Sequence, residues 1–289
     1  GHFKRAFDKL VNATSTISTD DKAFEDFADI FSRHVTRDEK SQLIGGSEAL
    51  SLPSKVKTIV TLKMSSDEKA CFEKNLKSID SMRMKQYCRV GVAPFTLQQK
   101  LIHPLSSDKL STDYNNSTKI SALLQEMKRL EKDDPNFRAV VYTQYSNTHE
   151  QVVSALNKFF FIQAVYQITG STTATERDAA IRVFQGPRTY PAVIVIMMRS
   201  GSTGMTLTQA SNLYLMEPSL DPATEIQAMG RINRLGQERD TEVKTFVFSD
   251  SVEANIVALH KEIESGRIEM NKSKITGKAV KILTSDLSL

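Results

Sequence analysis

Apolar positions along the first hundred residues follow a mostly helical spacing. The clearest cases are residues 23–31 and residues 72–84, where apolar side chains recur every three to four positions. Residues 56–64 differ, because polar and apolar side chains alternate there as in a half-buried strand. Residues 104–118 are rich in Ser, Asp and Asn and predict an exposed linker.

Beyond Lys119, helical and strand patterns alternate, which is the arrangement that builds a parallel sheet. Helices are predicted at residues 120–130, 148–159, 175–184, 222–229 and 252–263, and strands at residues 138–142, 161–166, 192–196, 212–216 and 243–248. Several of the strands are almost continuously apolar, as expected for strands covered on both faces. We therefore predict an α/β fold with a parallel sheet and helices on both faces over residues 119–270. A mainly helical segment over residues 1–118 precedes it, and a loosely structured tail over residues 271–289 follows.

Composition narrows the class of protein only modestly. The chain has 289 residues, and 40% of them are apolar. This is more apolar side-chain volume than one small core holds, so we expect two structural units. A net charge of +4 permits a nucleic-acid partner without requiring one. No apolar run is long enough to span a bilayer and no signal peptide is recognisable. The two cysteines are too few for a disulfide framework or a thiolate zinc site, and we expect a reducing intracellular compartment and no metal site.

The turns that follow the predicted strands are the candidate binding site, because parallel sheets bind ligands beyond the carboxyl ends of their strands. Residues 143–146 form a polar cluster, which an ordinary helix cap by Ser146 or Thr148 would also explain. Residues 169–172 offer hydroxyl groups and amides at a helix start, which suit a phosphate. Residues 199–208 form a loop of glycine and hydroxyl residues whose backbone could approach a sugar-phosphate chain.

Two arginines follow the fourth of these strands. Helical spacing predicts Gln227 and Arg231 on one face, with Arg234 one turn further along. A guanidinium group has five fixed donors and keeps its charge, so it can neutralise the charge that grows on a transferring γ-phosphoryl group. A pair of arginines can also be an ordinary solvated surface. Gly230 would let the chain come close to a ligand or a neighbouring lobe. Gly236 would end the helical element that carries the arginines.

Residues 227–237, which read Q-A-x-G-R-x-x-R-x-G-Q, resemble motif six of helicase superfamily two in the form used by Swi/Snf-type DNA-dependent ATPases. The three preceding turns resemble that family's motifs four, four-a and five, in order and spacing. Upstream, residues 52–56 resemble its L-P-x-K segment, and residues 97–104 its L-R-Q-x-x-x-H-P segment. The sequence of residues 215–227 is similar to that of the RING-bearing subgroup typified by the SHPRH-like proteins. The two cysteines of this chain cannot bind the two zinc ions of a RING finger.

Four positions depart from the family's pattern. Ser202 replaces a glycine, Thr206 an asparagine, Leu220 a tryptophan and Asn233 a histidine. These departures bear on the subgroup and on the details of DNA contact, whereas both arginines of motif six are kept.

The nucleotide-binding elements of a first motor lobe are not recognisable in the sequence. No G-x-x-x-x-G-K-[ST] run occurs; Gly277 and Lys278 lack the earlier glycine and the following hydroxyl residue. The acidic runs 38–40 and 67–69 have helical, polar surroundings and are expected to be solvated. We therefore expect the chain to be the second motor lobe together with the end of the first and its connecting helices.

The resemblance implies a RecA-like second lobe of a nuclear, ATP-dependent double-stranded DNA translocase, inactive as an ATPase without the first lobe. The residues implied are Arg231 and Arg234 as catalytic arginine fingers; Gln227, Gly204 and Gly230 at ATP; and Thr143, Gln144, Gly170, Ser171, Arg177, Gly201 and Thr206 at the DNA backbone. ATP and Mg²⁺ would be held mainly by the first lobe, and chromatin or repair proteins are further expected partners.

Two other readings stay open from the sequence. The chain could be a non-catalytic DNA- or protein-binding module. It could also be an unrelated α/β enzyme that binds a dinucleotide, although residues 201–204 lack the G-x-G-x-x-G order. His149 and His260 are expected to be packing or surface residues.

Overall fold

The computed structural model describes residues 43–44, 47–48, 52–77, 117–158, 164–200, 204–268 and 277–283. The chain divides into two compact units, Gly1–Ser51 and Leu52–Leu289. In the first unit, the described residues are two short antiparallel strands, β1 (Leu43–Ile44) and β2 (Ser47–Glu48). The predicted features at residues 23–31, 38–40 and 97–104 lie outside the described residues, as does the predicted linker 104–118 up to residue 116. At the end of that linker, Ser117 is buried and Thr118 begins a helix, so the exposed linker stops earlier than predicted.

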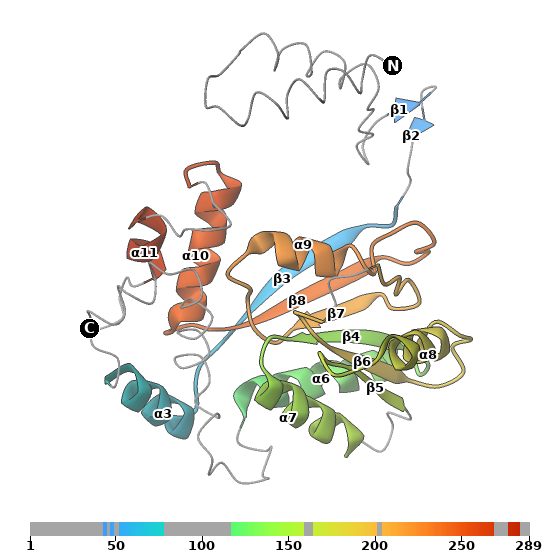
Figure 1. The fold of residues 1–289 in the computed structure, drawn as a ribbon, viewed down its shortest axis with the longest axis horizontal. Helices are drawn as coiled ribbons and strands as arrows, with labels where there is room; N and C mark the ends of the chain where they lie inside the picture. Colours follow the sequence, from blue (N-terminus) through green and yellow to red (C-terminus); the bar gives the residue numbers. More distant parts are fainter. Residues whose placement is uncertain are drawn as a thin grey trace, which may run out of the picture. The chain divides into compact units, whose positions relative to one another are not determined.

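A six-stranded sheet forms the centre of the second unit (Figure 1). Its strands are β3 (Lys55–Leu62), β4 (Arg138–Thr143), β5 (Ala164–Ile168), β6 (Ala192–Met197), β7 (Asn212–Leu215) and β8 (Thr241–Phe248). The strand order is β3-β8-β7-β4-β6-β5, and every neighbouring pair is parallel. The predicted parallel sheet is confirmed, and each predicted strand is present within a few residues of its expected bounds.

Helices cover both faces of this sheet. On one face lie α6 (Thr118–Asp133) and α7 (Ser146–Asn157), and on the other lie α8 (Ala174–Phe184) and α9 (Pro222–Met229). The described helices α3 (Ser66–Lys77), α10 (Val252–Glu264) and α11 (Gly277–Leu283) share a separate apolar cluster. Successive strand residues point to opposite faces, so Val141 packs with α6 and α7 while Val140 packs with α8 and α9. None of the helices among the described residues combines the length and apolar character needed to cross a membrane.

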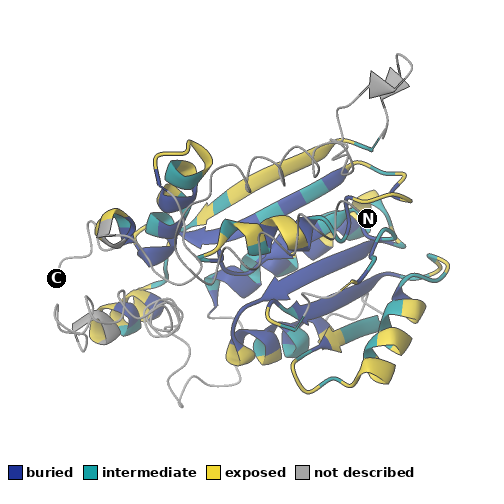
Figure 2. Cartoon of the chain, turned by 45° about the horizontal axis from the view of Figure 1, so that its top comes forward, coloured by how far each residue is buried: buried dark blue, intermediate teal, exposed yellow. Residues whose placement is uncertain are grey.

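The edge strand β3 comes from the segment that precedes the predicted lobe. The strand predicted at residues 56–64 is confirmed, and it pairs with β8 from Lys55 opposite Thr241 to Leu62 opposite Phe248. Its first five residues are exposed, and they form the pale rim of the sheet in Figure 2. Val60 and Leu62 pack against the core beneath α6. The sheet of the lobe therefore takes its edge strand from well before residue 118.

Two expectations about polar segments are wrong. Part of the predicted loose tail is the helix α11, because Ala279 and Leu283 are buried against Ile256 of α10. Glu68, expected on a solvated face, is buried. Its carboxylate accepts hydrogen bonds from Thr118 N at 3.0 Å and from Thr118 Oγ1 at 2.5 Å, so α3 caps the amino end of α6.

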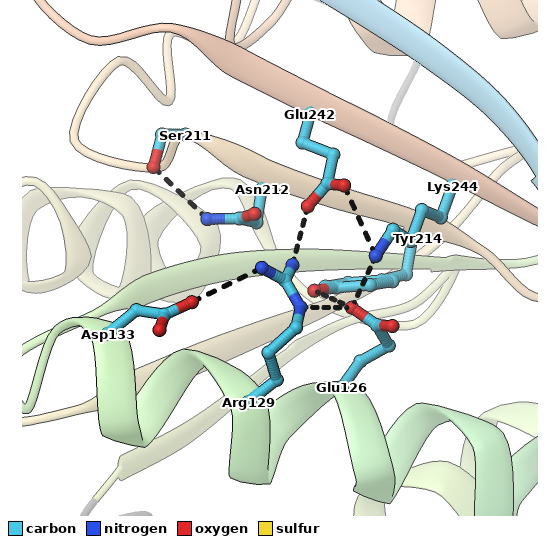
Figure 3. Close-up of polar contacts among 8 residues, drawn as sticks. All are labelled: Glu126, Arg129, Asp133, Ser211, Asn212, Tyr214, Glu242 and Lys244. Carbon is cyan, nitrogen blue, oxygen red and sulfur yellow. Dashed lines mark hydrogen bonds and ion pairs between the residues drawn. The ribbon is translucent and has the colours of Figure 1, made fainter.

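A polar network ties α6 to the amino ends of β7 and β8 (Figure 3). Lys244 Nζ lies 2.7 Å from Glu126 Oε2, and Arg129 Nη2 lies 2.5 Å from Glu242 Oε2. Tyr214 donates a hydrogen bond to Glu126 Oε2 at 3.3 Å. Burial alone would raise the pKa of Glu126, but the hydrogen bonds from Lys244 and Arg129 bring that pKa below its usual value. This network lies at the end of the strands opposite to the candidate site.

Candidate nucleotide- and DNA-binding site

The predicted turns meet at one edge of the sheet, where the carboxyl ends of the parallel strands lie. Met198 N donates to Thr143 O at 2.8 Å, which joins the turns after β6 and β4. A Cβ atom on Gly170 would lie 3.6 Å from Ser200 Oγ, so the turn after β5 adjoins the loop after β6. The structure therefore brings together the segments that the sequence singled out.

The helix α9 ends before the two arginines. Asp221 caps its start by accepting a hydrogen bond from Ala223 N at 2.9 Å, and Pro222 opens the first turn. The helix stops at Met229, and the chain continues through irregular turns over residues 230–236, the arginine loop. The helix therefore ends before both arginines, and turn hydrogen bonds from Arg231 N to Ala228 O and from Asn233 N to Met229 O begin the loop, so regular helical spacing does not extend to Arg234 as predicted.

The arginine loop is closed and attached by its backbone. Gly236 has a φ of +91°, a left-handed conformation in which glycine avoids strain, so it ends the loop as predicted. Arg231 O accepts a hydrogen bond from Leu207 N at 2.9 Å, which ties the loop to the chain after β6. Arg234 Nη1 reaches Thr206 Oγ1 at 3.5 Å, a long contact. Thr206 and Arg234, predicted for different roles, are thus neighbours.

The predicted nucleotide-side residues differ in their exposure. Arg234, Gln227 and Gly204 are exposed, whereas Arg231 is half-buried. Burial raises the pKa of Tyr142, and the positive charge of Arg231 opposes that shift, so Arg231 lies close enough to act on the phenol electrostatically. Gly204 has a φ of +63°, whereas Gly230 has a φ of −64° and needs no glycine for its backbone conformation.

Sequence reasoning missed the role of Gln237. Its side chain is only 6% exposed, and its amide uses all four hydrogen-bonding positions. Nε2 donates to Ala210 O at 2.7 Å and to Ile232 O at 3.0 Å. Oε1 accepts from Glu238 N at 3.1 Å and from Arg239 N at 3.0 Å. Gln237 therefore clamps the end of the arginine loop to the segment before β7.

Thr143 and Gln144, predicted to contact DNA, are buried. Thr143 Oγ1 lies 3.2 Å from Nδ1 of His149, and Gln144 Nε2 donates to Pro218 O at 2.6 Å. Burial also lowers the pKa of His149. Neither predicted side chain is open to a phosphate, so both hold neighbouring segments in place. The N-cap of α7 is Tyr145, so neither Ser146 nor Thr148 stands at the cap position.

An open hollow of about 760 Å³ lies beside the turn after β5. Its walls are Ser146, His149, Glu150, Gln167, Thr169, Gly170, Ser171, Thr172, Glu176 and Met197. Gly170 and Ser171 are exposed there, and Arg177 is half-buried in the first turns of α8. A capping box between Thr173 and Glu176 fixes the start of that helix. Gly201 lies outside the described residues.

Two solved structures have the same fold. The Sulfolobus solfataricus SWI2/SNF2 ATPase C-terminal domain has a TM-score of 0.60 at 14% identity and covers 82% of this chain and 100% of that chain. The Sulfolobus solfataricus SWI2/SNF2 ATPase core in complex with dsDNA has a TM-score of 0.60 at 18% identity and covers 93% of this chain and 54% of that chain. The expected RecA-like architecture is confirmed.

A family model, the helicase conserved C-terminal domain, matches residues 118–236. Residues 118–236 form a helicase C-terminal domain with SWI/SNF-type relatives. Human helicase-like transcription factor is 28% identical over 58% of this chain and 17% of its own length. Candida albicans DNA repair protein RAD5 is 29% identical over 50% of this chain and 13% of its own length. Human E3 ubiquitin-protein ligase SHPRH is 25% identical over 73% of this chain and 12% of its own length. The matched part of this helicase lobe spans less than a fifth of each relative's length.

The residues of this helicase lobe suit a phosphate better than a metal ion. Across the part of the chain that the structure describes, no group of three or more His, Cys, Asp or Glu side chains could hold a metal ion. The two arginines and the exposed backbone at Gly204 offer donors to an anion instead. The described part of the lobe thus presents donors that suit an anion such as a phosphate.

Proposed function

We propose that this chain is the second motor lobe of an ATP-dependent double-stranded DNA translocase. The observation that carries the proposal is the arginine loop, which presents an exposed Arg234 and a half-buried Arg231 at the carboxyl edge of the sheet. Gln237 and Leu207 fix this loop from two sides. Fixed guanidinium groups can stabilise charge as it develops, without reorganising at the moment of reaction.

In this mechanism, ATP lies between this lobe and a first motor lobe. Arg231 and Arg234 neutralise the charge that spreads over the γ-phosphoryl oxygens as the bond to the leaving ADP breaks. Gln227 and the backbone at Gly204 and Gly230 contact the nucleotide. Mg²⁺ would be held mainly by the first lobe.

Contacts to DNA come from other turns along the same edge, and Thr206 among them lies beside Arg234. Gly170, Ser171 and Thr206 offer backbone amides and hydroxyl groups, and Arg177 adds a positive charge. The carboxylates of Glu150 and Glu176 line the hollow and repel phosphate, so Arg177 and the neutral donors must offset them there. Such contacts grip the DNA backbone without reading bases, which suits a motor that moves along any sequence. Gly201 belongs to the same predicted set.

The complete protein is proposed to be nuclear and to act on chromatin or in DNA repair. The relatives are several times longer than the matched region, and the archaeal core that resembles this chain was solved with dsDNA. We therefore expect this chain alone to be inactive as an ATPase and the parent protein with its first lobe to be active.

The test is ATP hydrolysis with and without double-stranded DNA, measured on this chain and on the parent protein. We expect activity only in the parent protein, stimulated by DNA, and a loss of roughly a thousandfold in Arg231→Ala and Arg234→Ala. Arg182→Ala is the matched control, because Arg182 is an exposed arginine on α8. Parental turnover in both loop variants would refute the catalytic assignment. DNA binding without any hydrolysis in the parent protein would support a binding module instead.

A further inference from the structure

Buried polar groups hold the connection between β7 and α9, residues 216–221, from several elements. Glu217 Oε2 accepts a hydrogen bond from Gln144 N at 3.0 Å. Ser219 N donates to Glu225 Oε1 at 2.9 Å, and Ser219 O lies 2.7 Å from Nε2 of His260. This connection delivers α9 and then the arginine loop, so its position determines where the arginines lie.

Lys119 holds the first residue of this connection. Its Nζ donates to Met216 O at 2.7 Å and pairs with Glu253 Oε1 at 2.5 Å. The side chains of Lys119 and Glu253 are 8% and 0% exposed. The other carboxylate oxygen of Glu253 accepts a hydrogen bond from Phe248 N at 2.8 Å, so the pair is built into the ends of both β7 and β8.

Stability alone is a poor explanation for a buried ion pair. Removing two charges from water is unfavourable, and apolar residues of similar volume often serve a core equally well or better. Lys119 also donates a hydrogen bond that fixes the position of Met216 O, and an apolar side chain could not donate one. The same end of α6 is fixed from outside the sheet, because Glu68 of α3 holds Thr118.

We propose that Lys119, oriented by Glu253, is a positioning residue that sets the arginine loop against the nucleotide through Met216 and the connection to α9. This inference rests on the proposed function, in which Arg231 and Arg234 act on ATP. Loss of the Lys119 contact displaces the connection, and displacements of about 1 Å in a catalytic group can lower a rate by about a hundredfold. DNA affinity should fall less than turnover, since Gly170, Ser171 and Arg177 are held by other turns and only Thr206 of the DNA set lies beside Arg234.

The test measures ATP turnover, ATP KM, DNA affinity and thermal unfolding of the parent protein. Lys119→Met alone leaves the Glu253 carboxylate buried without this partner, so both stability and turnover should fall. The double variant Lys119→Met with Glu253→Gln removes both charges of the pair. The side-chain amide introduced at position 253 still accepts a hydrogen bond from Phe248 N. Stability should recover, whereas kcat should stay at least about tenfold low, with KM and DNA affinity within about twofold.

The matched control removes the Lys244 and Glu126 pair at the opposite end of the sheet (Figure 3). Lys244→Met with Glu126→Gln should leave kcat within about twofold. If the Lys119 double variant recovers turnover along with stability, the pair is structural only and the inference fails.

Arg231→Ala in the same assay separates this inference from the proposed function. A large loss in Arg231→Ala together with parental turnover in the Lys119 double variant refutes the positioning role alone. Parental turnover in Arg231→Ala refutes the proposed function itself.

Discussion

Replacing Gln237 by glutamate tests whether its amide clamps the arginine loop. The introduced carboxylate keeps acceptors for Glu238 N and Arg239 N but loses both donors. Ala210 O and Ile232 O, now 2.7 and 3.0 Å from the amide nitrogen, would then face an oxygen. A buried acceptor left without its donor is destabilising by about 1–3 kcal/mol. For two carbonyls, we expect Gln237→Glu to lower the free energy of unfolding by about 2–4 kcal/mol at pH 8.

The size of this loss should depend on pH. Burial and the two carbonyls raise the pKa of the introduced carboxyl group in the folded state above its unfolded value. Protonation then restores one of the two donors, so the deficit is smaller at low pH and grows as the pH rises through that raised pKa. Urea unfolding of this chain, followed by circular dichroism at pH 5 and pH 8, measures the difference. Gln125→Glu, at an exposed position of α6, is the control and should change stability by less than about 0.5 kcal/mol.

Two results would refute this reasoning. A loss below about 1 kcal/mol at pH 8 would mean that the amide donors contribute little to the folded state. An equal loss at both pH values would mean that the destabilisation does not come from the missing donors.

Two further predictions concern the same lobe. Gly236→Ala should lower the free energy of unfolding by about 1–2 kcal/mol through backbone strain alone, because φ is +91° and the nearest atom, Thr208 Oγ1, is 3.9 Å away. Gly230→Ala should be almost neutral, and equal losses in the two variants by urea unfolding would contradict the argument. The lowered pKa of His149 means that the unfolded state binds more protons, so its contribution is complete above about pH 6.5 and is lost as the pH falls through the lower folded pKa. His149→Asn should therefore flatten the pH dependence of stability below about pH 6.5, and an unchanged slope would contradict this.

Helices and strands of the lobe could be predicted because their signals are local. The apolar run of β6 and the periodicity of α10 each report burial within one element. The order of the strands carries no such signal. The alternation in β3 predicts a strand, but only the eight-residue pairing with β8 assigns it to this sheet. The helix α11 was missed because its burial depends on α10, which contacts it in space.

The candidate site could be predicted only at the level of segments. Parallel strands require their following turns to share an edge, so polar turns after strands identify the region. Which side chains face outward depends on neighbouring turns, and the sequence does not specify those neighbours. Thr143 and Gln144 are polar residues at the correct edge, yet they are buried because His149 and Pro218 lie against them.

The end of α9 bears most directly on mechanism. A regular helix would have positioned Arg231 and Arg234 by its own backbone hydrogen bonds, and substitutions elsewhere would have mattered little. The observed loop begins with turn hydrogen bonds from Arg231 N to Ala228 O and from Asn233 N to Met229 O, and it is also held by contacts from outside, including Gln237 after it and Leu207 before β7. Residues distant in sequence can therefore alter the arginines without touching ATP. A variant with normal DNA affinity and low turnover should accordingly be sought first among the buried polar residues around this loop.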